Sequence, residues 1–118
     1  LARRPDFLVF AGTGSALLPF LSLGGAGGIM ALANFAARPL RQVWQAFSAG
    51  RLEEARRVQL SLAEINTAVT SRYGVAGLKY AMDRCGLYGG PTRRPLLPLA
   101  APARAEIDRL VEALGLRG

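Results

Sequence analysis

The chain has 118 residues, 51% of them hydrophobic, and carries 15 lysines and arginines against eight aspartates and glutamates, a formal net charge of +7. That length suits one small domain with a modest core and is too short for a complete (β/α)8 barrel, which needs about 250 residues. The single cysteine excludes an internal disulfide, and the absence of histidine excludes histidine metal ligands and Ser-His or Cys-His nucleophiles within this chain.

The positive charge does not by itself predict a nucleic-acid partner. Every basic residue except Lys79 is an arginine, and the arginines are scattered in ones and twos without a stripe that alternates with aromatic residues. We interpret them as a solvated surface and expect no nucleic acid, although a groove flanked by these arginines would reverse that interpretation. One cysteine fits a reducing compartment, so we expect a cytoplasmic location.

An uncharged run of 31 residues, from Phe7 to Ala37, dominates the first third of the chain. Its glycines divide it into a short apolar block at 7–11, a helix predicted over 16–23 and a second apolar block at 28–32. Blocks that are apolar on both faces are typical of parallel strands covered by helices. The run therefore predicts two parallel, adjacent strands joined by a helix.

The same run also permits a membrane hairpin, because about 18 apolar residues suffice to span a bilayer as a helix. In that alternative, the chain is a small membrane-associated protein whose apolar hairpin at 7–37 is flanked by Arg3-Arg4 and by Arg38 and Arg41. Six glycines and four Ser, Thr or Asn residues within the run favour the strand interpretation, so we expect no membrane partner.

The rest of the chain predicts helices. Asn34 is a candidate N-cap, and Pro39 is expected at the start of the main helix, after a preliminary turn, with Gly50 at its end. The clearest helix covers 53–72, where apolar residues recur at alternating spacings of three and four.

Three apolar residues of the 53–72 helix, Leu62, Ile65 and Val69, are expected to be buried. Further helices are predicted over 76–85 and 102–114, joined by an extended segment that is rich in proline. Two parallel strands cannot form a stable sheet alone. The sequence therefore implies further strands, supplied by a missing N-terminal part or by another chain.

The loop Gly12-Thr13-Gly14-Ser15 follows the first predicted strand and opens a helix. Free backbone N–H groups at such a place suit a phosphate or carboxylate, although a tight turn that needs a positive φ explains the loop equally well. Leu17 stands where a G-x-G-x-x-G fingerprint needs its third glycine, so we predict no dinucleotide site and no cofactor.

Lys79 is the only side-chain amine in the chain. A lysine nucleophile needs a dry pocket that lowers its pKa, whereas Lys79 lies in a short predicted helix beside Tyr80. We therefore expect a surface or salt-bridging role for Lys79, and we expect Cys85 to be a small buried hydrophobe. No metal site is predicted.

Three stretches carry a resemblance to a known family: DFLVFAG at 6–12, LGGAGGIMALAN at 23–34 followed by AAR at 36–38, and GLKYAMDRCGLYGGPTRRPL at 77–96. Together they resemble the C-terminal part of the dihydrodipicolinate synthase / N-acetylneuraminate lyase family, in order and over essentially the whole chain. The segment from Tyr88 to Pro91 looks closer to the 4-hydroxy-2-oxoglutarate aldolase-like branch.

The resemblance implies an α/β fold: the C-terminal fragment of a (β/α)8 TIM barrel followed by a helical extension. On that interpretation, 7–11 is strand seven and 28–32 is strand eight. Residues 1–49 are then the last two β/α units of the barrel, and residues 50–118 are the C-terminal helical extension. At full length, the resemblance implies a homo-oligomer, either a dimer or a tetramer.

Members of the family are class I aldolases that join or cleave pyruvate, or act on other 2-oxo acids, through a lysine Schiff base. The resemblance implies that this lysine lies upstream of Leu1, so the chain holds no catalytic residue and is expected to be inactive alone. Three substrate-binding residues carry over. Gly12 ends strand seven beside the pocket, Ile29 presents its backbone carbonyl to bound pyruvate, and Thr13 is placed to contact the distal part of the substrate.

A third class of function, besides an aldolase and a membrane protein, is a non-catalytic assembly module made of the helical extension. Trapping with borohydride in the presence of pyruvate separates an aldolase from such a module, because only the aldolase forms a reducible imine.

Overall fold

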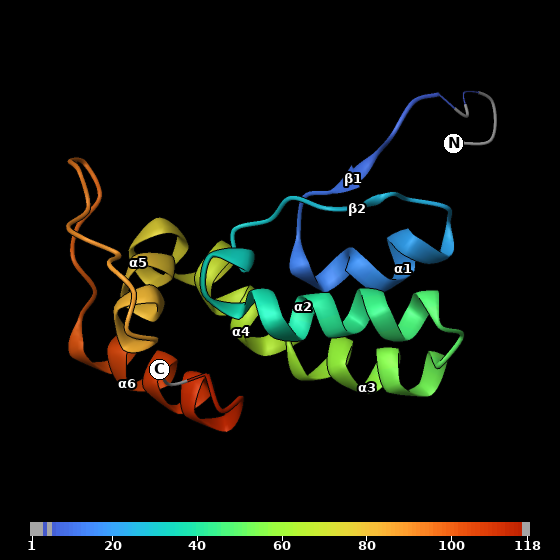
Figure 1. Ribbon diagram of the computed structural model, residues 1–118. Helices are drawn as coiled ribbons and strands as arrows, with labels where there is room; N and C mark the ends of the chain where they lie inside the picture. Colours follow the sequence, from blue (N-terminus) through green and yellow to red (C-terminus); the bar gives the residue numbers. More distant parts are fainter. Residues whose placement is uncertain (1–3, 5, 117–118) are drawn as a thin grey trace. The chain divides into compact units, whose positions relative to one another are not determined.

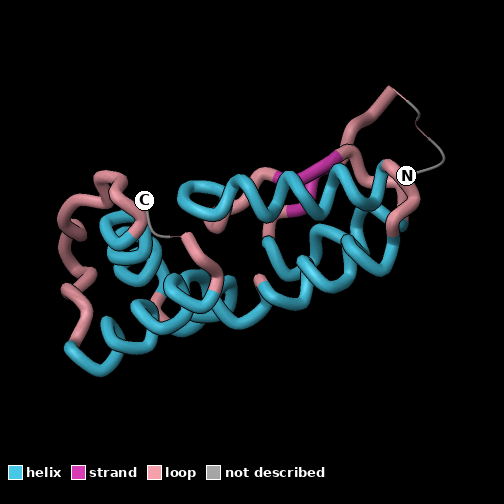
Figure 2. The backbone as a smooth tube through the Cα atoms, turned by 60° about the horizontal axis from the view of Figure 1, so that its bottom comes forward, coloured by secondary structure: helices cyan, strands magenta, loops and turns pink. Residues whose placement is uncertain are grey.

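The computed structural model describes residue 4 and residues 6–116, and its chain divides into two compact units, 1–63 and 64–118. The elements of the first unit are β1 (Phe10–Ala11), a 3-10 turn η1 (Gly14–Ala16), α1 (Leu17–Ser22), β2 (Gly27–Gly28), α2 (Ala33–Ser48) and α3 (Leu52–Ser61). Those that follow are α4 (Ala63–Thr67), a π-helical turn η2 (Ala68–Arg72), α5 (Gly74–Arg84) and α6 (Ala101–Ala113). The two strands are short, and helices make up most of the chain (Figures 1 and 2).

The two strands pair side by side and parallel, as the sequence predicts (Figure 1). Phe10 lies opposite Gly27 and Ala11 opposite Gly28. The strands are much shorter than the predicted blocks at 7–11 and 28–32, and β2 overlaps the second block only at Gly28. A ladder forms only where a neighbouring backbone accepts and donates, and each of these strands has one neighbour among the described residues.

The uncharged run is thus broken into short elements rather than folded as one long helical hairpin. Within the part of the chain that the structure describes, no helix has both the length and the apolarity to cross a bilayer.

The helices of the first unit pack on one another: α2 contacts both α1 and α3, and α1 also contacts α3 and both strands. α1 buries its leucines because they recur at helical spacing and face the other helices. The buried apolar residues of these three helices are Leu17, Leu18, Leu21, Phe35, Ala36, Leu40, Val43, Ala46 and Ala55.

α2 contains the preliminary turn that Pro39 predicts. Ala36 has non-helical angles, with φ −115° and ψ 35°, so a short first turn precedes the main helix. Proline lacks an N–H and its ring crowds the carbonyl four residues earlier, here that of Phe35, which explains a break at this place. The predicted N-cap at Asn34 is wrong, since α2 begins at Ala33 and the Asn34 amide donates to the Ala31 carbonyl at 2.9 Å.

The helix predicted over 53–72 is present as three consecutive helical pieces, α3, α4 and η2. The first break falls at Leu62, and the last piece widens into a π-helical turn. Leu62, Ile65 and Val69 are all buried, as the periodicity predicts. Gly74, with φ +55°, is the first residue of α5, which begins two residues earlier than the sequence predicts.

Two pairs of a phenol and a carboxylate join the start and middle of α5 to α6. Tyr73 donates to Oε2 of Glu106 at 2.5 Å, and Tyr80 donates to Asp108 at 3.1 Å. The hydrogen bond from Tyr73 lowers the pKa of Glu106, because it stabilises the ionised carboxylate. The same bond raises the pKa of Tyr73.

We predict that Leu62→Ala lowers the free energy of unfolding by about 2–5 kcal/mol, because it deletes a fully buried side chain and leaves a cavity. Leu62 has 0% of its surface exposed. Urea unfolding followed by circular dichroism measures the change. The control Leu60→Ala removes a leucine of α3 that is 68% exposed and should change stability by less than about 0.5 kcal/mol. Equal effects of the two variants would contradict the prediction.

A second prediction concerns acid stability. Since the folded-state pKa of Glu106 is lowered, its contribution is present above its unfolded-state pKa and is lost as pH falls through the folded-state pKa. Tyr73→Phe should raise the pKa of Glu106 and weaken this acid-sensitive contribution. Carboxyl carbon shifts in an NMR titration report it. Tyr88→Phe, at a phenol that is 84% exposed, is the control, and an unmoved Glu106 pKa in Tyr73→Phe would refute the assignment.

Candidate functional site at the carboxyl ends of the strands

The three site residues implied by the resemblance lie just beyond the two strands. Gly12 and Thr13 directly follow β1, and Ile29 directly follows β2. The strands are parallel, so both of these ends lie at the same edge of the pair. The Ile29 N–H donates to the carbonyl of Ala11 at 2.9 Å, which places Ile29 beside the residue before Gly12. Sequence positions 17 residues apart are thereby brought together.

The backbone conformation does not explain why a glycine stands at position 12. Neither Gly12 nor Gly14 has a positive φ, so the interpretation of this loop as a turn that requires a positive φ is wrong. A Cβ added at Gly12 would meet no atom within 4 Å in the part of the chain that the structure describes. The remaining physical use of a glycine here is close approach of another group to the backbone.

The loop after β1 carries two neighbouring hydroxyl groups. Thr13 has an extended backbone and precedes the 3-10 turn, and its Oγ1 lies 3.2 Å from the Oγ of Ser15. The carbonyl of Thr13 accepts a hydrogen bond from Ala16 at 3.2 Å, which closes the turn. Neither hydroxyl caps the helix. Hydroxyl groups both donate and accept hydrogen bonds, so this loop can pair with oxygen atoms of a polar ligand.

The side chain of Gln59, in α3, forms two hydrogen bonds to the backbone next to this loop. The sequence did not predict these contacts. The Gln59 Oε1 accepts from the Leu18 N–H at 2.9 Å, and its Nε2 donates to the Gly14 carbonyl at 2.7 Å. Only 7% of Gln59 is exposed. The available signal was a polar residue on the buried face of a helix, since Gln59 follows Ala55 by four residues and precedes Leu62 by three.

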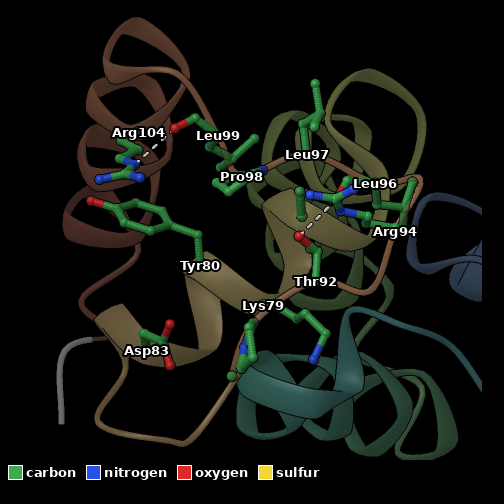
Figure 3. Close-up of a pocket in the computed structure, with 13 residues that line it drawn as sticks. Lys79, Tyr80, Asp83, Thr92, Arg94, Leu96, Leu97, Pro98, Leu99 and Arg104 are labelled. Atoms are coloured by element: carbon green, nitrogen blue, oxygen red, sulfur yellow. Dashed lines mark hydrogen bonds between the residues drawn. The ribbon is translucent and has the colours of Figure 1, made fainter.

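A concave region of about 390 Å³ lies in the unit 64–118, between α5, the segment 90–99 and Arg104 of α6 (Figure 3). Lys79 and Asp83 lie on its α5 side. The Lys79 ammonium donates to the Gly89 carbonyl at 2.5 Å, and Asp83 accepts from the Gly89 N–H at 2.7 Å. Lys79 therefore anchors a loop, and the surface or salt-bridging role predicted for it is not the role observed. Its ammonium is also engaged, unlike that of a nucleophilic lysine.

The other polar groups of this region also serve the fold. Arg104 donates to the Leu99 carbonyl at 3.0 Å, and its guanidinium lies 5.8 Å from the centre of the Tyr80 ring (Figure 3). Burial raises the pKa of Tyr80, and the hydrogen bond to Asp108 raises it further. Burial likewise raises the pKa of Cys85. Cys85 is half-buried, whereas the sequence predicts that it is buried. Among the described residues, no cluster of acidic side chains and cysteine has the geometry for a metal ion.

Parallel strands joined by a helix are the repeating unit of α/β barrels, and enzymes with that fold carry their active sites at the carboxyl ends of the strands. Comparison with known families then identifies the group. The model of the dihydrodipicolinate synthetase family matches residues 2–114, and the chain belongs to this family.

Two similar curated proteins carry the same name. The chain is 37% identical over 117 residues to a 4-hydroxy-tetrahydrodipicolinate synthase of Pelodictyon phaeoclathratiforme and 35% identical to one of Chlorobium luteolum. Each match covers 98% of this chain and 40% of the relative. The chain thus spans well under half the length of the curated relatives that it matches.

Solved structures agree with this placement. A dihydrodipicolinate synthase-like protein of Thermus thermophilus superposes with a TM-score of 0.84 at 32% identity, over 98% of this chain and 41% of that one. A prophage protein of the same family from E. coli K12, solved in complex with pyruvate, superposes with a TM-score of 0.85 at 27% identity, over 98% and 39% of the two chains.

Proposed function

We propose that this chain is the C-terminal portion of a class I aldolase or lyase that forms a lysine Schiff base with pyruvate or another 2-oxo acid. The observation that carries the proposal is the family match over residues 2–114, on a chain whose parallel strands bring Gly12 and Ile29 to one edge. A related protein from E. coli K12 was solved in complex with pyruvate, which supports this class of substrate.

In this proposal β1 belongs to strand seven and β2 to strand eight of a (β/α)8 barrel. Residues 1–49 are its last two β/α units, and residues 50–118 are the helical extension. The missing strands come from an N-terminal part of a longer protein or from another chain. Exposed apolar side chains on and beside the strands support this, since lone strands leave such faces uncovered: Phe7, Leu8, Phe10 and Ile29.

Each of the three site residues has a role in this proposal. Gly12 leaves room for substrate beside the backbone, the Ile29 carbonyl faces pyruvate, and the Thr13 hydroxyl pairs with the distal part of the substrate. Schiff-base chemistry also needs an amine of lowered pKa, a proton relay and a clamp for the pyruvate carboxylate. These groups belong to the upstream part, so the 118 residues alone are inactive. No cofactor is required.

The proposal also includes the setting of the enzyme. The full-length protein works in the cytoplasm as a homo-oligomer, a dimer or a tetramer. Its partner is a small 2-oxo acid, with no nucleic acid and no membrane involved. The scattered arginines support the exclusion of nucleic acid, because they form no continuous basic stripe along the sequence.

Borohydride trapping tests the proposal. We predict that the isolated chain, incubated with pyruvate and borohydride, gains no stable adduct, because the Lys79 ammonium is engaged with the Gly89 carbonyl. The full-length protein should gain one pyruvyl adduct per chain, on a lysine upstream of Leu1. Intact mass followed by peptide mapping locates it.

Lys79→Arg in the full-length protein is the matched control, because arginine keeps a cationic donor and cannot form the imine. Its trapping should equal that of the unsubstituted protein. An adduct on Lys79, or no adduct on any lysine of the full-length protein, would overturn the proposal.

Gly12→Ala tests the place of the pocket. The added methyl meets no neighbour within 4 Å among the described residues, so the free energy of unfolding should stay within about 0.5 kcal/mol. If Gly12 borders the substrate, the methyl intrudes on it, and the pyruvate concentration for half-maximal trapping should rise about tenfold. Leu60→Ala, remote from this loop in sequence and exposed, should leave that concentration unchanged. Normal half-saturation in Gly12→Ala would remove Gly12 from the site.

A further inference from the structure

We propose that Gln59 is a positioning residue for the substrate loop after β1, acting from α3 through two hydrogen bonds to backbone groups. The inference rests on the proposed function, since it takes the loop of Gly12 and Thr13 as part of the substrate pocket. It adds a residue that lies in the helix after the predicted barrel units and touches no predicted site residue directly.

Gln59 contacts the backbone at two places just after the loop. Its side chain spans from the carbonyl of Gly14, the first residue of the 3-10 turn, to the N–H of Leu18, the second residue of α1. Gly14 and Leu18 are both buried. Gly14 is only two residues after Gly12, so a restraint on its carbonyl also restrains the loop that leaves β1.

The start of α1 has no cap from its own N-cap residue, because Ala16 makes no side-chain hydrogen bond to it. The first N–H groups of a helix depend on acceptors from outside the helix. Gln59 supplies an acceptor to the Leu18 N–H from a helix 41 residues away in sequence. Without it, that N–H and the Gly14 carbonyl would be buried without this partner, and such groups move toward any group or water that satisfies them. The loop would move with them.

The two contacts also require an amide in particular. One partner is a donor and the other an acceptor, which fixes the orientation of the Gln59 amide. Glutamate would turn a carboxylate oxygen toward the Gly14 carbonyl, methionine would offer neither group, and asparagine is one methylene too short to reach both. A purely space-filling role at this buried position would be met equally well by methionine.

The test uses the full-length protein with two substitutions. Gln59→Met keeps the volume and removes both hydrogen bonds. Gln59→Asn keeps an amide but shortens its reach by one methylene, and it is the variant that decides the question if Gln59→Met does not fold. We expect the pyruvate concentration for half-maximal borohydride trapping to rise about tenfold in Gln59→Met and by a smaller factor in Gln59→Asn. The amount trapped at saturation should be unchanged.

Ile107→Ala is the matched control for lost stability. Ile107 is fully buried in α6, in the other unit, and makes no hydrogen bond to the loop. It should lower the thermal midpoint and leave half-saturation unchanged. Amide exchange at Leu18 should accelerate in both Gln59 variants, which verifies that the contact is lost.

Faster exchange at Leu18 with normal half-saturation would overturn the inference and leave Gln59 a structural residue. A rise in half-saturation of equal size in Ile107→Ala would do the same, because it would then follow stability. If the unsubstituted protein traps no pyruvate, the proposed function fails and this inference falls with it. Trapping by that protein with unchanged Gln59 variants refutes only the inference.

Discussion

Parallel pairing of β1 with β2 is the constraint on which the rest of the first unit depends. Two parallel strands cannot be joined by a tight turn, so the chain between them must return along the pair, and α1 makes that return. The crossover sends both carboxyl ends to one edge, where Gly12 and Ile29 lie. It also leaves each strand with a single neighbour among the described residues, which keeps the ladder short and exposes apolar side chains around it.

Much of this fold could be predicted from local patterns. Apolar blocks separated by glycines predicted adjacent parallel strands, Pro39 predicted the irregular first turn of α2, and the spacing of Leu62, Ile65 and Val69 predicted their burial. The predicted strand lengths were wrong because a strand extends only as far as a neighbouring strand pairs with it. The residues of one strand do not reveal where its neighbour ends. The cap at Asn34 was wrong because its amide bonds a nearby carbonyl instead of a helix N–H.

Part of the candidate site could be predicted from the sequence and part could not. The resemblance supplied Gly12, Thr13 and Ile29, and the β1–β2 pairing explains why residues so far apart in sequence belong to one place. Gln59 could not be found by spacing, because its two partners are backbone groups 41 and 45 residues away. Backbone atoms are the same in every residue, so no sequence motif marks them. Only its polarity on a buried helical face set Gln59 apart.

The anchoring of Gly89 has a consequence for how the chain can vary. Lys79 and Asp83, one helical turn apart on α5, grip the carbonyl and the N–H of the same residue, and the carbonyl oxygen of Lys79 itself lies where a Cβ of residue 89 would stand. The ammonium therefore faces the carbonyl of Gly89 and the carboxylate faces its N–H, so the two contacts form only with this orientation of the peptide groups. Exchanging the two side chains would preserve net charge and helix propensity, yet it would set donor against donor and acceptor against acceptor. A substitution at position 79 or 83 would remove one of these two contacts, and a side chain at position 89 would collide with the Lys79 backbone.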